Sequence, residues 1–168
     1  MSSQSRMVGV VGLRRKLDNP WISESLAPHA VLSDAPAVAP GAPLGPARGG
    51  ELVYLGPAEL VFWTGETGHY RDNLVADPPK LWVSLNPRAD GSGVGGYDIG
   101  VVTANPYEGE ALSDGSGLLL EAVDMPADIA ADLARFVEAH HVEQVFVKRK
   151  RDGKGRRGGR GEGRDGPG

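Results

Sequence analysis

The segment GETGHYRDNLVADPPKLWVSL (residues 65–85) carries the densest group of chemically active side chains in the chain. His69 stands between Glu66 and Asp72, and an imidazole beside a carboxylate is the pattern used in general acid–base catalysis. Three polar residues on one short loop are, however, more often a solvated turn than a catalytic site. We therefore keep acid–base catalysis as an alternative and favour a binding role for this segment.

A binding role is suggested by aromatic and charged side chains that follow one another closely. Tyr70 and Leu74 are four residues apart, so HYRDNL can form one helical turn that buries both of them, and this structural alternative stays open. The two Pro residues in ADPP end that turn, because proline cannot continue a helix. The protein-binding surface predicted from the sequence consists of Trp21, His69, Tyr70, Arg71, Trp82 and Tyr107.

Other patterns that could indicate an enzyme are weak. GSGVGG (91–96) matches G-x-G-x-x-G, but a strand rather than a helix is expected after it, so we interpret it as a hairpin loop. His140 and His141 are neighbours at a helix end, where their side chains diverge. The chain has no Cys, which removes thiolate metal sites and thiol catalysis. We expect no enzymatic activity, no metal and no cofactor.

Charge is divided unevenly along the chain. Residues 148–168 hold nine basic and three acidic residues, a net charge of +6, whereas residues 1–147 hold nine basic and nineteen acidic residues, a net of −10. Such a split predicts a folded acidic body with a disordered basic Arg/Gly-rich tail. An alternative function is therefore nucleic-acid binding through charge and guanidinium stacking. The residues that would carry it are Lys148, Arg149, Lys150, Arg151, Arg156, Arg157 and Arg160.

Targeting signals are not apparent in the sequence. The short apolar run near the N-terminus precedes the basic residues, whereas a signal peptide has the opposite order. No apolar run approaches the length needed to span a membrane. We expect a cytoplasmic protein that does not act at a membrane.

The hydrophobic patterns predict an α+β fold, mostly antiparallel β, in which six or seven strands form a curved sheet or partial barrel. One C-terminal amphipathic helix is expected over 125–141, followed by a short strand or extended arm over 142–147. We divide the chain into a flexible N-terminus (1–6), a single β-rich domain (7–147) with a low-complexity loop (34–50), and the disordered tail (148–168). The expected strands are 7–17, 21–33 with a break at Pro28, 51–56, 58–65, 80–86, 97–105 and 117–123, with a tight turn at Gly56-Pro57 between the third and fourth.

Four stretches of the chain together resemble a known family. They are RRKLDNPW, GETGHYRDNLVADPPKLWVSL, TANPYEGEALSD and MPADIAADLARFVEAHHVEQVFVKRKR. In this order they resemble an uncharacterised small bacterial family, a domain of unknown function encoded beside formate dehydrogenase genes. The similar region spans roughly residues 8 to 151, and the Ala/Pro-rich insert and the tail depart from it.

The resemblance implies a cytoplasmic helper in the expression, maturation or assembly of this molybdoenzyme. The implied partner is formate dehydrogenase or one of its maturation factors. Sulfur transfer to the molybdenum cofactor or insertion of iron–sulfur clusters would need cysteine, which the chain lacks. The expectation that remains is a non-catalytic adaptor or assembly factor that binds protein.

Overall fold

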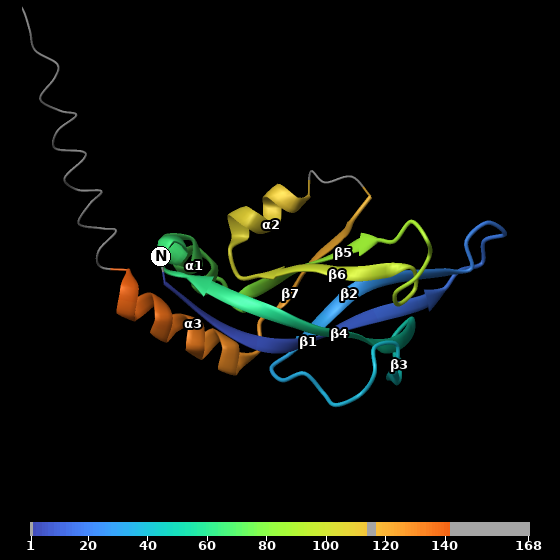
Figure 1. Cartoon of the computed structure of the whole chain (residues 1–168), viewed down its shortest axis with the longest axis horizontal. Coiled ribbons are helices and arrows are strands. Elements are labelled where there is room, and N and C mark those ends of the chain that lie inside the picture. Colours follow the sequence, from blue (N-terminus) through green and yellow to red (C-terminus); the bar gives the residue numbers. More distant parts are fainter. Residues whose placement is uncertain (1, 114–116, 142–168) are drawn as a thin grey trace, which may run out of the picture.

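The chain folds into two antiparallel β-sheets with helices gathered at one end. A computed structural model describes residues 2–113 and 117–141 (Figure 1). The first sheet has the strand order β2-β1-β4-β3, and the second has the order β6-β5-β7. The strands are β1 (Ser3–Lys16), β2 (Glu24–Leu32), β3 (Pro43–Ala47), β4 (Gly50–Trp63), β5 (Lys80–Pro87), β6 (Tyr97–Thr103) and β7 (Leu119–Asp124).

The strands β1 and β4 are the two central strands of the first sheet, and both are longer than expected. The expectation of a flexible N-terminus is wrong for Ser3–Arg6, which pair with the end of β4. The predicted tight turn at Gly56-Pro57 is also wrong. Gly56 has a φ of 136° and lies at a register shift between β1 and β4, so the chain bulges there and continues as one strand.

The proline-rich segment 34–50 is not a loop throughout, because it contains β3, which pairs with the first residues of β4. Two prolines fit in β3 because it is an edge strand, where a missing N–H costs no ladder bond. Pro28 does not interrupt β2, but it lies opposite Gly12, where the β1–β2 register shifts. The predicted strand over 21–33 begins three residues before the observed one, because β2 starts at Glu24.

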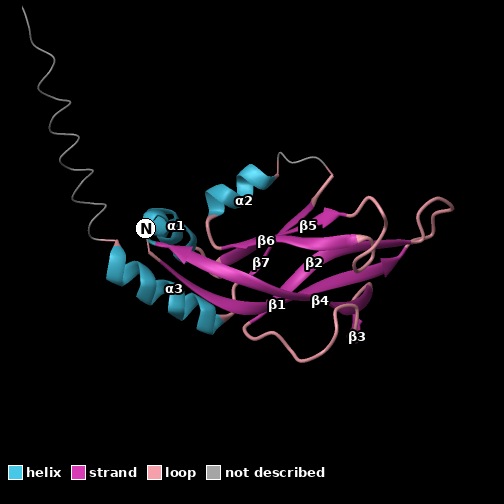
Figure 2. Cartoon of the chain, in the orientation of Figure 1, coloured by secondary structure: helices cyan, strands magenta, loops and turns pink. Residues whose placement is uncertain are grey.

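Three α-helices are present in the described residues, so the expectation of a single helix is wrong (Figure 2). The expected C-terminal helix is α3 (Ala127–His140). The HYRDNL turn belongs to α1 (Thr67–Leu74), which follows a short 3-10 turn, η1 (Thr64–Glu66). The helix α2 (Pro106–Leu112) is not among the elements predicted from the sequence. None of these helices has the length and apolar character that crossing a membrane requires.

One hydrophobic core joins the two sheets and α3. From α3 it receives Ile129, Leu133, Phe136 and Val137, and from β5 the alternating residues Leu81, Val83 and Leu85. The helices α1 and α3 lie at one end of the sheets, while the loop that joins β1 to β2 lies at the opposite end (Figure 1). The two sheets are not hydrogen-bonded to each other, so the fold is not a closed barrel.

Candidate functional site

The predicted surface is divided between the two ends of the molecule. At the helical end, His69 and Asp72 of α1 meet Tyr107 of α2. The rings of His69 and Tyr107 are in contact with centroids 4.4 Å apart and are tilted by 48° to each other. Tyr107 Oη donates a hydrogen bond to Asp72 Oδ2 at 2.8 Å. That bond raises the pKa of Tyr107, because it stabilises the protonated phenol beside a carboxylate. Three exposed side chains thus join α1 to α2.

Asn105 positions α2 and His69 together. Its side-chain oxygen accepts from the backbone N–H groups of Tyr107 and Glu108, which makes it the N-cap of α2. Its Nδ2 lies 3.0 Å from His69 Nδ1. Of the two carboxylates considered for acid–base chemistry, Glu66 accepts from Tyr70 and Asp72 accepts from Tyr107. The partner of the His69 ring nitrogen is an amide rather than either carboxylate.

Arg71 connects α1 to the end of α3. Its Nη1 lies 2.8 Å from His141 Nε2, and His141 Nδ1 lies 3.3 Å from Thr67 Oγ1. A guanidinium has only donors, so Arg71 donates this hydrogen bond to His141 Nε2. The polar side chains of the helical end are therefore largely occupied with one another.

Tyr70 is not part of any exposed surface, and its place in the prediction is wrong. It is 1% exposed and packs edge-on against Phe62 and near Phe136 in the core. Its hydroxyl accepts from the backbone N–H of Trp63 and donates to Glu66, each at 2.9 Å. Burial raises its phenol pKa far above the ordinary value. The alternative of a core tyrosine on α1 is confirmed.

Trp82 is only half-buried, but α2 covers its ring. A Cβ built on Gly109 would lie 2.3 Å from Trp82 Cγ, so the helix backbone rests directly on the indole. The ring is a platform for α2 and offers little area to a partner.

Trp21 lies at the opposite end, in the loop between β1 and β2. It is 88% exposed, and its neighbours Ile22 and Leu17 are exposed as well. The loop is ordered by Asn19, whose side-chain oxygen accepts from the N–H groups of Trp21 and Ile22 at 2.7 and 3.3 Å. A further bond from Leu17 N–H to Ser23 O closes its base at 2.9 Å. We call Leu17, Trp21 and Ile22 the apolar loop.

Beneath the apolar loop, the space between the two sheets opens to solvent. A pocket of about 250 Å³ is lined by Leu17 and Ile22 together with Leu26, Tyr97 and Leu119. The last three side chains are half-buried and pack against the hydrophobic core. The core is thus covered by helices at one end and reaches the surface at this one.

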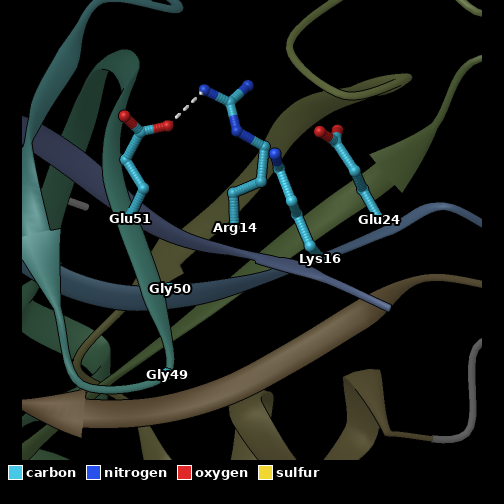
Figure 3. Close-up of a pocket in the computed structure, with 6 residues that line it drawn as sticks. All are labelled: Arg14, Lys16, Glu24, Gly49, Gly50 and Glu51. Carbon is cyan, nitrogen blue, oxygen red and sulfur yellow. Dashed lines mark hydrogen bonds and ion pairs between the residues drawn. The ribbon is translucent and has the colours of Figure 1, made fainter. Parts of the chain in front are cut away.

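A polar groove of about 540 Å³ adjoins the pocket and shares Arg14 and Glu24 with it. Figure 3 shows Arg14 beside Glu51, with Lys16 and Glu24 standing next to them. Arg14 Nη2 donates to Glu51 Oε1 at 2.9 Å. Lys16 and Glu24 are directly opposite residues of the β1–β2 pair. Two cations and two carboxylates line this groove, so its charge is balanced.

The apolar loop, the pocket and the polar groove form the candidate site, which we call the open end. Trp21 is the one residue of the open end that belongs to the surface predicted from the sequence. A signal for the others was present, because RRKLDNPWISE contains a turn followed by two adjacent large apolar residues. Assigning Trp21 and Ile22 to a strand hid this signal. A loop places both side chains outside the sheet, whereas a strand would place one on each face.

Several predicted features cannot be placed. The candidate nucleic-acid contacts from Lys148 to Arg160, the tail and the arm over 142–147 lie outside the described residues. Within residues 2–113 and 117–141, no group of three or more His, Asp or Glu side chains is arranged to hold a metal ion.

The family described as "Protein of unknown function (DUF3305)" matches residues 7–150 of this chain. No curated protein and no solved structure matches the chain.

Proposed function

This chain belongs to the family described as "Protein of unknown function (DUF3305)", and we propose that it is a non-catalytic accessory factor that binds a partner protein through the open end. The observation that carries the proposal is Trp21. A tryptophan that is 88% exposed, on a loop ordered by its own hydrogen bonds, leaves a large apolar area in water. Apolar area of this kind marks interaction sites, and Trp is enriched among the residues that dominate binding energy.

The surroundings of Trp21 have the composition of a protein interface. Ile22 and Leu17 extend the apolar area, and the pocket below can take one apolar side chain of a partner. The polar groove with Arg14 and Glu24 lies at its border. An apolar centre with a charged rim is the usual anatomy of a protein–protein contact. Because the loop is already ordered, little conformational entropy is lost when a partner covers it.

The partner we propose is formate dehydrogenase or one of its maturation factors. This part of the proposal comes from the resemblance of the four sequence stretches quoted above. It is supported by one feature of the structure: RRKLDNPW, one of those stretches, forms the end of β1 and the loop that presents Trp21. A surface used by the whole family would be expected to lie in such a stretch.

The experiment is a pull-down of the tagged full-length chain from cells that express formate dehydrogenase. Trp21→Ala combined with Ile22→Ser removes most of the exposed apolar area without touching a buried residue. The matched control is Val75→Ser, because Val75 is 85% exposed but follows α1 at the helical end. We expect the wild type and the control to recover a dehydrogenase subunit or maturation factor, and the double variant to lose it.

Two outcomes of the pull-down oppose the proposal. Equal recovery by the double variant and the wild type would show that the open end is not the docking surface. Recovery of nucleic acid alone, in place of any dehydrogenase component, would move the function to the basic tail.

A further inference from the structure

A second groove lies on the side of the molecule, between β4 and β6, and has no role in the proposed function. Its volume is about 240 Å³. Val61 and Trp63 of β4 and Val101 of β6 give it an apolar surface, and Trp63 is 40% exposed. Glu59 and Glu108 also line it. The groove therefore combines an exposed aromatic ring with two carboxylates.

Both carboxylates can take a cationic partner. Glu108 accepts a bond from Thr103 Oγ1 through Oε1, at 2.6 Å, and within residues 2–113 and 117–141 its other oxygen has no hydrogen bond. Glu59 is exposed and has no ion pair with any residue of the described part of the chain. An arginine beside them could also stack on the indole of Trp63.

The strands that border the groove each have a free edge. Residues Ala58–Trp63 of β4 pair with β1 on one side only, and β6 pairs only with β5 among the described strands. Both strands run toward the helical end, since β4 leads into η1 and β6 leads into α2. A segment that enters the groove from the helical end runs antiparallel to both, and every pairing among the described strands is antiparallel.

The chain itself provides such a segment. It leaves α3 at His141, which contacts Thr67 of α1, and Thr67 follows Trp63 by four residues. Helical geometry makes that separation about 6–8 Å. The six residues after His141, VEQVFV, can extend over about 20 Å, which is enough to reach the groove and enter it.

The composition of the segment is complementary to the groove. VEQVFV has four apolar residues, and KRKR (148–151) follows it directly. Residues 148–168, which follow VEQVFV directly, carry a net charge of +6, whereas residues 1–147 carry −10. The family match ends at residue 150, nine residues past His141, so most of this segment belongs to the family's shared unit.

We propose that residues 145–151 of this chain dock in the groove between β4 and β6. Phe146 and Val147 cover Val61, Val101 and Trp63, and the basic residues from Lys148 onward meet Glu59 and Glu108. Docked in this way, the basic residues nearest the body are held against it and are withheld from nucleic acid.

The chain contains no cysteine, so one introduced cysteine carries a nitroxide label at a single position. We would label full-length Gly153→Cys and measure paramagnetic relaxation of the backbone amides by NMR, against the reduced label. The expected result is the strongest relaxation over residues 58–63 and 100–103. At ~1 M salt, where the Debye length is about 3 Å, the effect should fall several-fold.

Charge variants provide the decisive comparison. Glu59→Lys should lower the relaxation over the groove several-fold, and adding Lys148→Glu with Arg149→Glu should restore it. Glu138→Lys is the matched control, since Glu138 is an exposed carboxylate on α3 away from the groove, and it should change nothing. Relaxation spread evenly over the surface or centred elsewhere, or a groove signal unchanged by Glu59→Lys, would overturn the proposal.

Discussion

The backbone of Gly109 in α2 lies directly against the indole ring of Trp82 in β5. A Cβ at residue 109 would come within 2.3 Å of Trp82 Cγ and 2.5 Å of Cδ1. No real Cβ tolerates such contacts, so glycine is the residue that lets α2 settle on the sheet. The contact also explains how Asn105, Tyr107 and His69 come together, because it holds α2 in place above β5.

The first prediction follows from this contact. Gly109→Ala should push α2 away from Trp82 and lower the free energy of unfolding by about 1–3 kcal/mol, as overpacking does in other cores. Urea denaturation followed by tryptophan fluorescence measures the loss. Ala111→Ser changes an exposed residue of the same helix and should leave stability nearly unchanged. A fully stable Gly109→Ala protein would mean that α2 does not rest on the ring.

Asn73 ties α1 to the ends of two strands. Its amide donates to the carbonyls of Lys80 and Ala104 and its oxygen accepts from Lys80 N–H, at 2.7 to 2.9 Å, and the residue is buried. Asn73→Ala leaves these groups without partners, so we expect a loss of roughly 2–3 kcal/mol in unfolding free energy. Asn86→Ala, at an exposed position of β5, is the control. If Asn73→Ala were as stable as Asn86→Ala, the hydrogen bonds of Asn73 would not stabilise the fold.

Asn19 orders the apolar loop without contributing to the core. Asn19→Ala removes its two bonds to Trp21 and Ile22, so the loop should become mobile on the picosecond-to-nanosecond timescale while the melting temperature stays nearly constant. NMR order parameters of the Trp21 amide measure this change. Partner recovery should fall as well, because binding must then order the loop. A rigid loop in Asn19→Ala would show that other contacts hold it.

Ser33 and Arg6 hold the carboxylate of Asp128, at the start of α3. The Ser33 hydroxyl donates to it, and this bond, with the Arg6 guanidinium beside it, lowers the pKa of Asp128 below its ordinary value. Because the pKa of Asp128 is lower in the folded protein, its ionised carboxylate stabilises the fold at pH values above its ordinary pKa of about 4. This stabilisation is lost as the pH falls through the lowered pKa.

The matching variant is Ser33→Ala, which should raise the pKa of Asp128 toward its ordinary value. The direct measurement is an NMR titration of the Asp128 side-chain carboxyl carbon. The stability difference between Ser33→Ala and the wild type should be present at neutral pH and shrink in acid. If the pKa of Asp128 did not change in Ser33→Ala, the Ser33 hydroxyl would not be the group that lowers it.

The elements with strong periodicity could be predicted from the sequence. Leu81, Val83 and Leu85 alternate in β5 and are all buried, and the helical spacing of Ile129, Leu133, Phe136 and Val137 identifies the buried face of α3. These patterns are local, so one stretch of chain contains all the information. The burial of Tyr70 could be stated only as one of two alternatives, since α1 has a weak apolar face and its core contact comes from Phe62 and Phe136.

Elements that depend on distant partners could not be predicted. Gly56-Pro57 has the composition of a turn, but β1 continues to pair on both sides of it, and this pairing turns the same residues into a bulge. In the same way, β3 exists because β4 offers it an edge. Gly109 weakens the helical sequence pattern of α2. Glycine is needed at this position because of the ring of Trp82, which is far away in sequence.

The candidate site shows the same limit. His69 and Tyr107 meet because α1 and α2 share one end of the sheets, and their spacing in the sequence does not indicate this. The sequence places Trp21 with them only as another aromatic residue, but β1 is long enough to carry Trp21 to the opposite end. Which end of a strand a loop occupies depends on the topology of the whole sheet.

Binding at the open end can be tested by replacing Trp21 with the photo-reactive amino acid p-benzoylphenylalanine in the full-length chain, in cells that express formate dehydrogenase. A partner bound at the open end would cross-link to residue 21 on irradiation, and mass spectrometry would identify it. We expect an adduct with a dehydrogenase subunit or maturation factor at residue 21 and none when the same group replaces Val75. Adducts at residue 75 and none at residue 21 would contradict it.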